Sequence, residues 1–336
     1  MCKDFTGQGT NSCSSPLCHC PFRPTNRPWL VQYFRTLNPS ISLRTGPDPQ
    51  ARLHLDSNGT WQWLRRPRPS EMLEVKRVLE GVGLHAVNEY PGYLEEGFRP
   101  YDPIELLQLT EEKVCRGDAR KYTDFYCVGV YGGISTGYLV GCCLRCVFCW
   151  VNMSRDFPDR YGRFYTPDQV AERLITNARQ RRVSKLRLSG GEPTLGKDHL
   201  LSVLDRIDGR GFTFILETNG IPLGHDPDYA LALAEYRDVH VRVSLKAGNA
   251  AGFEARTGAR GEYWELPFRA IERLMRAGVS FHVAAMTDPR LMPAEERRSL
   301  VRRLREMGYE DFFEEERCDP YQTSVLRLRA AGFQLF

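Results

Sequence analysis

Apolar and polar residues along the second half of the chain follow two periods that recur in turn. In residues 184–189 apolar side chains occupy every second position, which is typical of a strand, and a helix-like stretch follows. Repeated strand–helix units imply an α/β fold in which helices cover a parallel sheet. We expect helices over residues 166–182, 197–208, 228–236, 263–277 and 293–307, and strands near residues 137–141, 184–189, 212–217, 239–245, 279–286 and 311–314.

The first hundred residues differ from the rest, because they are rich in proline, arginine and tryptophan and show little helical periodicity. One β-hairpin is expected there. Residues 52–56 and 60–64 alternate in polarity and flank Asn58 and Gly59, a pair that suits a tight turn with positive φ at both positions.

Length and composition fit a chain with a large core and an extension. The chain has 336 residues, 42% of them hydrophobic, so a sizeable core can form. We divide it into an N-terminal extension of residues 1–100, a core over residues 125–310 and a C-terminal tail over residues 311–336. The net charge of +4 does not argue for a nucleic-acid partner.

The chain shows no signal for a membrane or for export. No run of about 18 apolar residues occurs, so neither a transmembrane helix nor a membrane partner is expected. Residues 1–5 lack the apolar core of a signal peptide. The 11 cysteines, an odd number in an unexported chain, favour metal ligation over a disulfide framework. We therefore expect a cytoplasmic protein.

Residues 142–149 read CCLRCVFC and carry the strongest chemical signal. Cys142, Cys146 and Cys149 have the spacing C-x3-C-x2-C. Three thiolates on one loop can hold three corners of a cubane iron–sulfur cluster, which normally takes four cysteine ligands. One iron would then keep an open position, where chemistry can take place.

A structural zinc ion is the alternative for the same loop. The chain would then be a non-catalytic zinc- or iron–sulfur-stabilised interaction protein. Zinc sites, however, usually pair two separate groups of ligands. Cys143 could be a fourth ligand, but adjacent side chains rarely point at one ion.

Three further predicted strands end in polar or glycine-rich turns. Residues 190–193 read GGEP, residues 217–220 read ETNG and residues 244–248 read SLKAG. Glycines allow positive φ and a close approach of the backbone to a ligand. Because ligands sit at the carboxyl ends of parallel strands, we expect these turns and the cysteine loop to share one edge.

The cysteine spacing, with Phe148 before the last cysteine, and the GGEP turn together resemble the radical SAM superfamily. The resemblance implies a partial (β/α)6 TIM-like barrel and a 4Fe–4S cluster whose open iron is chelated by S-adenosyl-L-methionine. It implies that Phe148 lies by the adenine, and that three residues hold the methionine amino group, namely Gly190, Gly191 and Glu192. The cluster ligands it implies are Cys142, Cys146 and Cys149.

The ETNG and SLK turns are similar to those of glycyl-radical-enzyme activases and carboxydeazaguanine synthases. By this resemblance Asn219, Ser244 and Lys246 contact the ribose and carboxylate of the cofactor. Residues 121–150 also resemble an uncharacterised group of archaeal radical SAM iron–sulfur proteins.

The implied activity is that of an oxidoreductase or activase. Such an enzyme cleaves S-adenosylmethionine reductively to a 5′-deoxyadenosyl radical, which abstracts hydrogen from a substrate. The sequence does not identify that substrate: it is a partner protein in an activase-like reaction, and a small molecule, peptide or RNA in the alternative subclass. A reductant such as ferredoxin or flavodoxin is the implied electron donor.

Four more cysteines lie near the N-terminus, in a segment with little apolar content. With His19 they are enough for a second metal centre, either zinc or an auxiliary cluster. The alternative is a leader in which the cysteines are incidental. The four residues are Cys2, Cys13, Cys18 and Cys20.

Overall fold

The computed structural model describes residues 43–44, 52–55, 61–63, 100–333 and 335. The chain forms two units, Met1–Glu71 and Met72–Phe336. Within the described part of the first unit, three short strands pair antiparallel in the order β1-β2-β3. They are β1 (Leu43–Arg44), β2 (Arg52–Leu55) and β3 (Trp61–Trp63).

Strands β2 and β3 are the two arms of the predicted hairpin. Leu53 pairs with Trp63 and Leu55 pairs with Trp61, so the alternating residues lie in register. The strands of the hairpin are therefore confirmed, whereas its turn lies outside the described residues. Strand β1, which pairs with β2, was not predicted.

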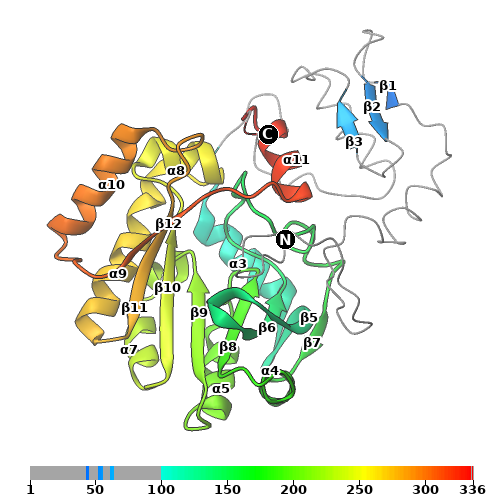
Figure 1. Cartoon of the computed structure of the whole chain (residues 1–336), viewed down its shortest axis with the longest axis vertical. Helices are drawn as coiled ribbons and strands as arrows, with labels where there is room; N and C mark the ends of the chain where they lie inside the picture. The colour runs from blue at the N-terminus through cyan, green and yellow to red at the C-terminus, as the bar shows by residue number, and fades with distance from the viewer. Residues whose placement is uncertain (1–42, 45–51, 56–60, 64–99, 334, 336) are drawn as a thin grey trace, which may run out of the picture. The chain divides into compact units, whose positions relative to one another are not determined.

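A nine-stranded sheet runs through the described part of the second unit (Figure 1). Its order is β12-β11-β10-β9-β8-β6-β5-β4, with β7 paired to β5. The strands from β6 to β12 in that order are all parallel, and β4, β5 and β7 pair antiparallel. The strands are β4 (Cys115–Arg116), β5 (Ala119–Val128), β6 (Ile134–Leu139), β7 (Arg163–Tyr165), β8 (Lys185–Gly190), β9 (Thr213–Thr218), β10 (Val239–Leu245), β11 (Phe281–Met286) and β12 (Phe313–Glu316).

Within the described residues this sheet has two ends, β12 and β4, which do not pair with each other. The sheet is therefore open rather than a closed barrel. Its repeated parallel strand–helix units confirm the predicted α/β fold with an incomplete barrel.

Helices of the repeated units cover one face of the sheet. The core between helices and sheet takes alternate strand residues, such as Val241 and Val243 of β10, and leaves Arg242 and Ser244 on the other face. The helices are α3 (Pro103–Val114), α4 (Pro167–Arg181), α5 (Lys197–Ile207), α6 (Ile221–His225), α7 (Tyr229–Ala234), α8 (Ala250–Thr257), α9 (Glu265–Ala277), α10 (Ala294–Glu306) and α11 (Gln322–Ala330).

Helix α4 illustrates why the predicted helices form where they do. Thr166 accepts a hydrogen bond from the amide of Gln169, whose side chain caps Thr166 in return, and Pro167 occupies the first turn. Val170 and Leu174 then lie on one buried face, four residues apart. Cap and apolar stripe agree, so the helix is local in origin.

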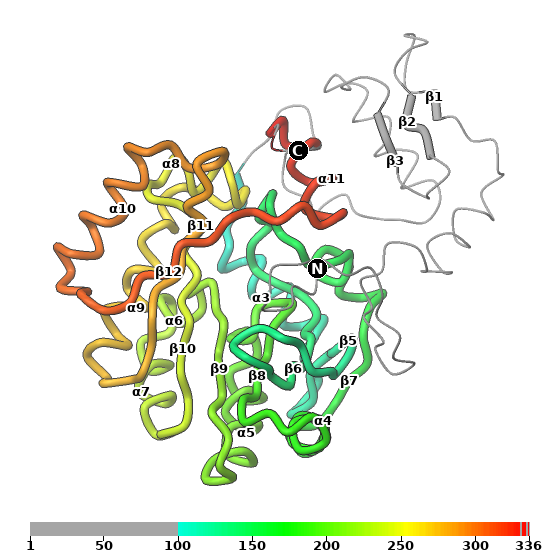
Figure 2. Tube along the Cα trace, viewed as in Figure 1, coloured from blue at the N-terminus to red at the C-terminus, as the bar shows by residue number. Residues whose placement is uncertain are grey.

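After β12 the chain crosses to α11, which lies beside the cysteine loop (Figure 2). Asp288, which follows β11, accepts the amide of Cys318 at 3.0 Å, and Arg290 donates to the Cys318 carbonyl at 3.0 Å. Cys318, in the predicted C-terminal tail, is therefore held at the carboxyl edge of the parallel sheet.

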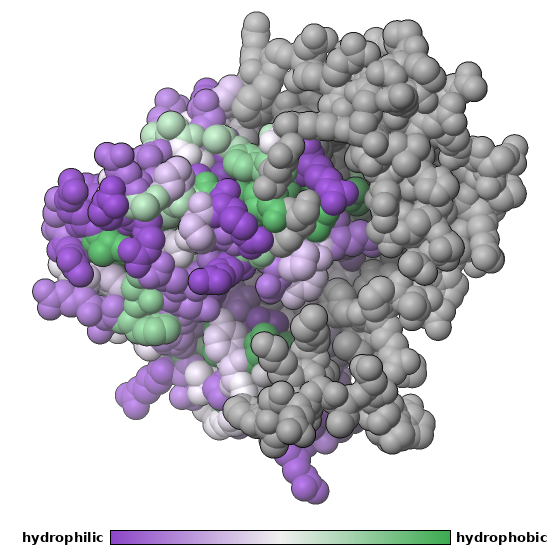
Figure 3. Space-filling view, turned by 45° about the horizontal axis from the view of Figure 1, so that its top comes forward, coloured by the Kyte–Doolittle hydropathy of each residue, from purple (hydrophilic) through white to green (hydrophobic). Residues whose placement is uncertain are grey.

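The visible described surface is mostly hydrophilic, with apolar residues in small separate areas (Figure 3). Exposed large apolar side chains such as Leu231 and Phe312 are of the scattered kind that ordinary surfaces carry. Among the described residues, no helix combines the length and apolar character of a membrane span.

Candidate functional site

The cysteine loop, residues 142–149, begins just after β6, at the carboxyl end of the parallel sheet. The turn after β8 is fastened to its start. The amide of Gly191 donates to the Leu139 carbonyl at 2.9 Å, and that of Glu192 donates to the Gly141 carbonyl at 2.8 Å. A Cβ on Gly191 would lie 2.2 Å from the Gly141 oxygen, so the close approach requires glycine.

The three cysteines predicted as cluster ligands differ in burial. Cys146 is buried, whereas Cys142 and Cys149 are half-buried. Burial raises the pKa of Cys146 to about 12, and the positive charge of Lys246 acts against that rise. The hydrogen bond with Cys143 lowers the pKa of Cys142 to about 7, although burial opposes it. A buried thiolate is stabilised by a cation or a metal, so this donor set suits metal ligation.

Within residues 100–333 and the other described positions, no three His, Cys, Asp or Glu side chains lie together as ligands of one metal ion. The thiol of Cys143 lies 3.4 Å from Nδ2 of Asn219. The four N-terminal cysteines, Cys2, Cys13, Cys18 and Cys20, lie outside the described residues.

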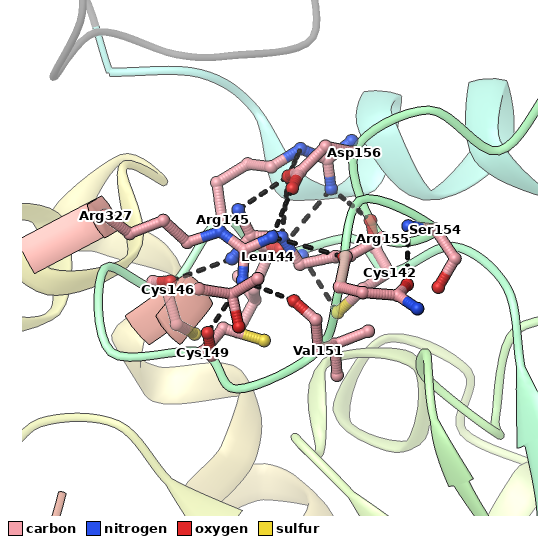
Figure 4. A network of polar contacts seen from close by, with 12 residues as sticks. Cys142, Leu144, Arg145, Cys146, Cys149, Val151, Ser154, Arg155, Asp156 and Arg327 are labelled. Carbon is pink, nitrogen blue, oxygen red and sulfur yellow. Dashed lines mark hydrogen bonds and ion pairs between the residues drawn. The ribbon is translucent and has the colours of Figure 1, made fainter. Parts of the chain in front are cut away.

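Each of the three cysteines has its carbonyl oxygen bound by a different buried arginine (Figure 4). These arginines shape a loop that has no helix or strand geometry of its own. Sequence reasoning missed their role, because two of them lie outside the cysteine motif. The donor–acceptor pairs are Arg145 Nη1 with Cys142 at 2.6 Å, Arg155 Nη1 with Cys146 at 2.8 Å, and Arg327 Nη1 with Cys149 at 2.7 Å.

Helix α8 connects the loop to the end of β10. The amide of Val147 donates to the carbonyl of Arg256 at 2.9 Å, in the last turn of α8. The guanidinium of Arg256 donates to the Lys246 carbonyl at 3.1 Å and is paired with Glu296 of α10. The segment carrying Lys246 is therefore held by the same helix that holds the loop.

Glu192 of the GGEP turn is buried and uses its carboxylate within the protein. Its Oε1 accepts the hydroxyl of Thr194 at 2.6 Å and the amide of Thr194 at 3.1 Å. Its Oε2 accepts the amide of Asn219 at 2.8 Å. Glu192 thus ties the turn after β8 to the turn after β9. The contact of Gly190, Gly191 and Glu192 with a methionine amino group stays a prediction.

The remaining residues predicted for the cofactor lie at the same edge. Nδ2 of Asn219 is 3.6 Å from Sγ of Cys142. Nζ of Lys246 donates to Oγ of Ser244 at 2.7 Å. Phe148 is buried in an apolar cluster with other residues of the loop. The fold therefore gathers the cysteine loop and the turns after β8, β9 and β10, as the sequence predicts.

A row of paired charges on the sheet face opposite the helical core was not predicted. Arg187 of β8 binds Glu217 of β9 at 2.9 Å, and Arg242 of β10 binds Glu314 and Glu316 of β12 at 2.7 and 2.8 Å. Burial acts to raise the pKa of Glu217, but Arg187 and Arg242 lower it below its usual range. Charged residues at alternate strand positions were the available signal.

A hollow of about 410 Å³ lies at the amino ends of β10 and β11 and is lined partly by His240, His282 and Phe312. His240 Nε2 and His282 Nδ1 are 2.7 Å apart, and His282 Nε2 lies 3.1 Å from Glu314. This hollow is at the edge of the sheet opposite the cysteine loop.

Among protein-family models, the radical SAM superfamily matches residues 138–303. This segment contains the cysteine loop, the GGEP turn and strands β8 to β11. A comparison with curated proteins found no match.

Several solved structures are distantly similar. SuiB from Streptococcus suis, bound to S-adenosylmethionine, shares 19% identity over 55% of this chain and 40% of its own, with a TM-score of 0.44. The structure of anSMEcpe with bound AdoMet and Cp18Cys peptide shares 20% identity over 53% of this chain and 48% of its own, with a TM-score of 0.41. QueE from Escherichia coli shares 13% identity over 65% of this chain and 99% of its own, with a TM-score of 0.33. The chain thus spans less than half of the first two proteins.

Proposed function

We propose that this chain, whose residues 138–303 match the radical SAM superfamily, is an enzyme that cleaves S-adenosylmethionine reductively at a 4Fe–4S cluster. Cys142, Cys146 and Cys149 are the proposed ligands. One observation carries the proposal: the three-cysteine loop lies at the carboxyl edge of the parallel sheet, and Gly141, the residue before it, accepts a hydrogen bond from the amide of Glu192 in the GGEP turn.

When bound, the cluster supplies an electron to the sulfonium of S-adenosylmethionine, which in this superfamily gives methionine and a 5′-deoxyadenosyl radical. The protein's part is to hold and orient. The three thiolates would hold the cluster, and the amide of Asn219 lies beside the sulfur of Cys142. Phe148 and the apolar residues around it exclude water from the loop.

Lys246 and Ser244 are the proposed partners of the cofactor's carboxylate and ribose. Lys246 is a compact cation with three donors, one of which already reaches Ser244. Glu192 acts in this proposal by holding Asn219 and its own glycine turn in place.

We extend the proposal to an activase-like reaction, in which the hydrogen atom is taken from a partner protein. The ETNG and SLK turns, which resemble those of activases, support this extension. A reductant such as ferredoxin or flavodoxin would supply the electron.

The proposal is tested by anaerobic reconstitution of the full chain with iron and sulfide, followed by reduction in the presence of S-adenosylmethionine. We expect a 4Fe–4S signal in electron paramagnetic resonance and release of 5′-deoxyadenosine, which chromatography measures. Cys146→Ala should abolish the release, since it removes one proposed ligand.

Cys127→Ala is the matched control, because Cys127 lies near the end of β5, pairs with Ser135 at the amino end of β6, and donates its thiol to the Asn177 carbonyl at 3.4 Å. It should keep full cluster content and cleavage. Undiminished cleavage in Cys146→Ala, or a chain that takes up zinc in place of iron, would overturn the assignment and favour the interaction protein.

A further inference from the structure

We propose that Arg145, Arg155 and Arg327, with Asp156 as their shared counter-charge, set the reduction potential of the metal centre on the cysteine loop. The proposal rests on the function proposed above. It gives α11, which carries Arg327, a direct part in the electrostatics of the site.

The three guanidinium groups converge on one carboxylate next to the loop (Figure 4). Arg155 donates to Asp156 Oδ1 through Nε at 2.6 Å, and Arg327 donates to Oδ2 at 2.5 Å. Nε of Arg145 lies 3.8 Å from Oδ1. All four side chains are at most 4% exposed, so water screens these charges little.

Asp156 is ionised in this network. Burial acts to raise its pKa, but the charges of Arg155, Arg327 and Arg145 lower it to about 2. The group therefore combines three fixed positive charges with one fixed negative charge. Each of the four can be removed separately by substitution.

The positive charges lie against the backbone of the proposed ligands. Each arginine donates to the carbonyl of one of the three cysteines. The positive charge therefore contacts the same residue that carries the thiolate. A four-iron cluster with three thiolate ligands is anionic and becomes more so on reduction. Net charge and hydrogen bonding around a cluster shift its potential, and nearby cations favour the reduced form.

Arg327 also holds the segment that directly follows the loop. Besides the Cys149 carbonyl it donates to the carbonyls of Val151 at 2.5 Å and Asn152 at 3.2 Å. Thr323, on the same helix, donates to the carbonyl of Trp150 at 2.7 Å. Helix α11 therefore offers a charged and an uncharged contact to one short segment, and this pair separates electrostatics from positioning.

The test is a redox titration of the anaerobically reconstituted full chain, in which the electron paramagnetic resonance signal measures how much of the cluster is reduced. Arg327→Gln should shift the midpoint potential to more negative values, and Asp156→Asn should shift it to more positive values. Arg327→Lys, which retains the charge, should stay near the unsubstituted protein.

Thr323→Val is the matched control, since it removes a hydrogen bond between α11 and Trp150, the residue after the loop, without changing charge. It should leave the potential unchanged. Shifts of the same sign in Arg327→Gln and Asp156→Asn, or an equal shift in Thr323→Val, would overturn the proposal and leave these residues a structural role alone.

If Arg327→Gln does not hold a cluster, Asp156→Asn and Arg327→Lys still test the proposal. The proposal requires a positive shift in the first and almost none in the second, and any other pair of results contradicts it. The potential is measured without substrate turnover. A chain with no iron–sulfur signal at all would refute the proposed function, whereas normal signals with unshifted potentials would refute only the role of the arginines.

Discussion

Gly191 shows that the glycines of the GGEP turn serve a contact inside the protein. The sequence predicts a close approach of the backbone to a ligand there. The structure shows a close approach to the Gly141 carbonyl at the start of the cysteine loop. Neighbouring Gly190 has φ of +92°, which glycine adopts without strain. The close contact between the carboxyl ends of β6 and β8 therefore accounts for both glycines.

Gly191→Ala should displace either the turn or the loop, because the added Cβ would lie 2.2 Å from the Gly141 oxygen. We expect a loss of about 1–3 kcal/mol in the free energy of unfolding and a lower iron content after reconstitution. Chemical denaturation and iron analysis measure the two effects.

Gly129→Ala provides the comparison. A Cβ at Gly129 meets no atom within 4 Å, and its φ of −79° suits any residue. This variant should match the unsubstituted protein in both measurements. If Gly191→Ala did as well, the close contact between turn and loop would not exist as described.

At the scale of elements, the periodic strands and capped helices could be predicted from sequence. Strand β10 lies where alternation places it, and α4 begins at Thr166, where cap chemistry places it. Strand β5 was missed, because a shift of register between Tyr122 and Asp124 breaks its alternation. Helix α8 was missed because it is short and contains Gly252, a poor helix former.

The predicted site divides in the same way. Its cysteines and turns are local sequence patterns at strand ends, so they were found. The arginines next to the loop were not, because Arg327 meets Asp156 across 171 residues of chain and no local period encodes that contact. The paired charges on the sheet face are likewise contacts between strands, set by register.

Arg242 supports an acid-sensitive contribution of β12 to stability. The hydrogen bond of His282 and the charge of Arg242 lower the pKa of Glu314 to about 2, although burial opposes them. A depressed carboxyl pKa contributes stability that is fully present above its usual value of 4.5 and is lost as pH falls toward 2. Arg242→Met should therefore cost about 1–3 kcal/mol at pH 7, and less as the pH falls below about 4.

Denaturant unfolding from pH 7 to pH 3 measures this difference. Arg297→Met is the control, because Arg297 and Glu315 form an exposed pair on the other face of β12, with side chains 42% and 41% exposed. It should cost at most about 1 kcal/mol. A deficit in Arg242→Met that stays constant with pH would contradict the linkage to Glu314.

At the scale of the whole molecule, the sequence predicts a second metal centre at the N-terminal cysteines. A short polar segment has little apolar surface to bury, and a bound metal would supply folding free energy. The full chain should therefore carry more metal than one cubane. Replacing four cysteines with serine should remove only the excess, as measured by iron and zinc analysis. The four are Cys2, Cys13, Cys18 and Cys20.

The same analysis after Cys146→Ala completes the comparison, because that variant should lose the cubane iron and keep the excess. Equal metal content in the unsubstituted and the serine-substituted chain would show that the N-terminal cysteines bind nothing.

The contact between Arg327 and the Cys149 carbonyl has a consequence for biosynthesis. The two residues are 178 positions apart, so a ribosome needs roughly 10–35 s to add the arginine after the cysteine. Throughout that interval the cysteine loop of the nascent chain lacks its hydrogen bond to Arg327. Iron delivered before α11 has docked would meet a loop held by Arg145 and Arg155 alone. Iron delivered afterwards would meet a loop held by all three arginines. Maturation of the metal centre is therefore expected to follow translation of α11.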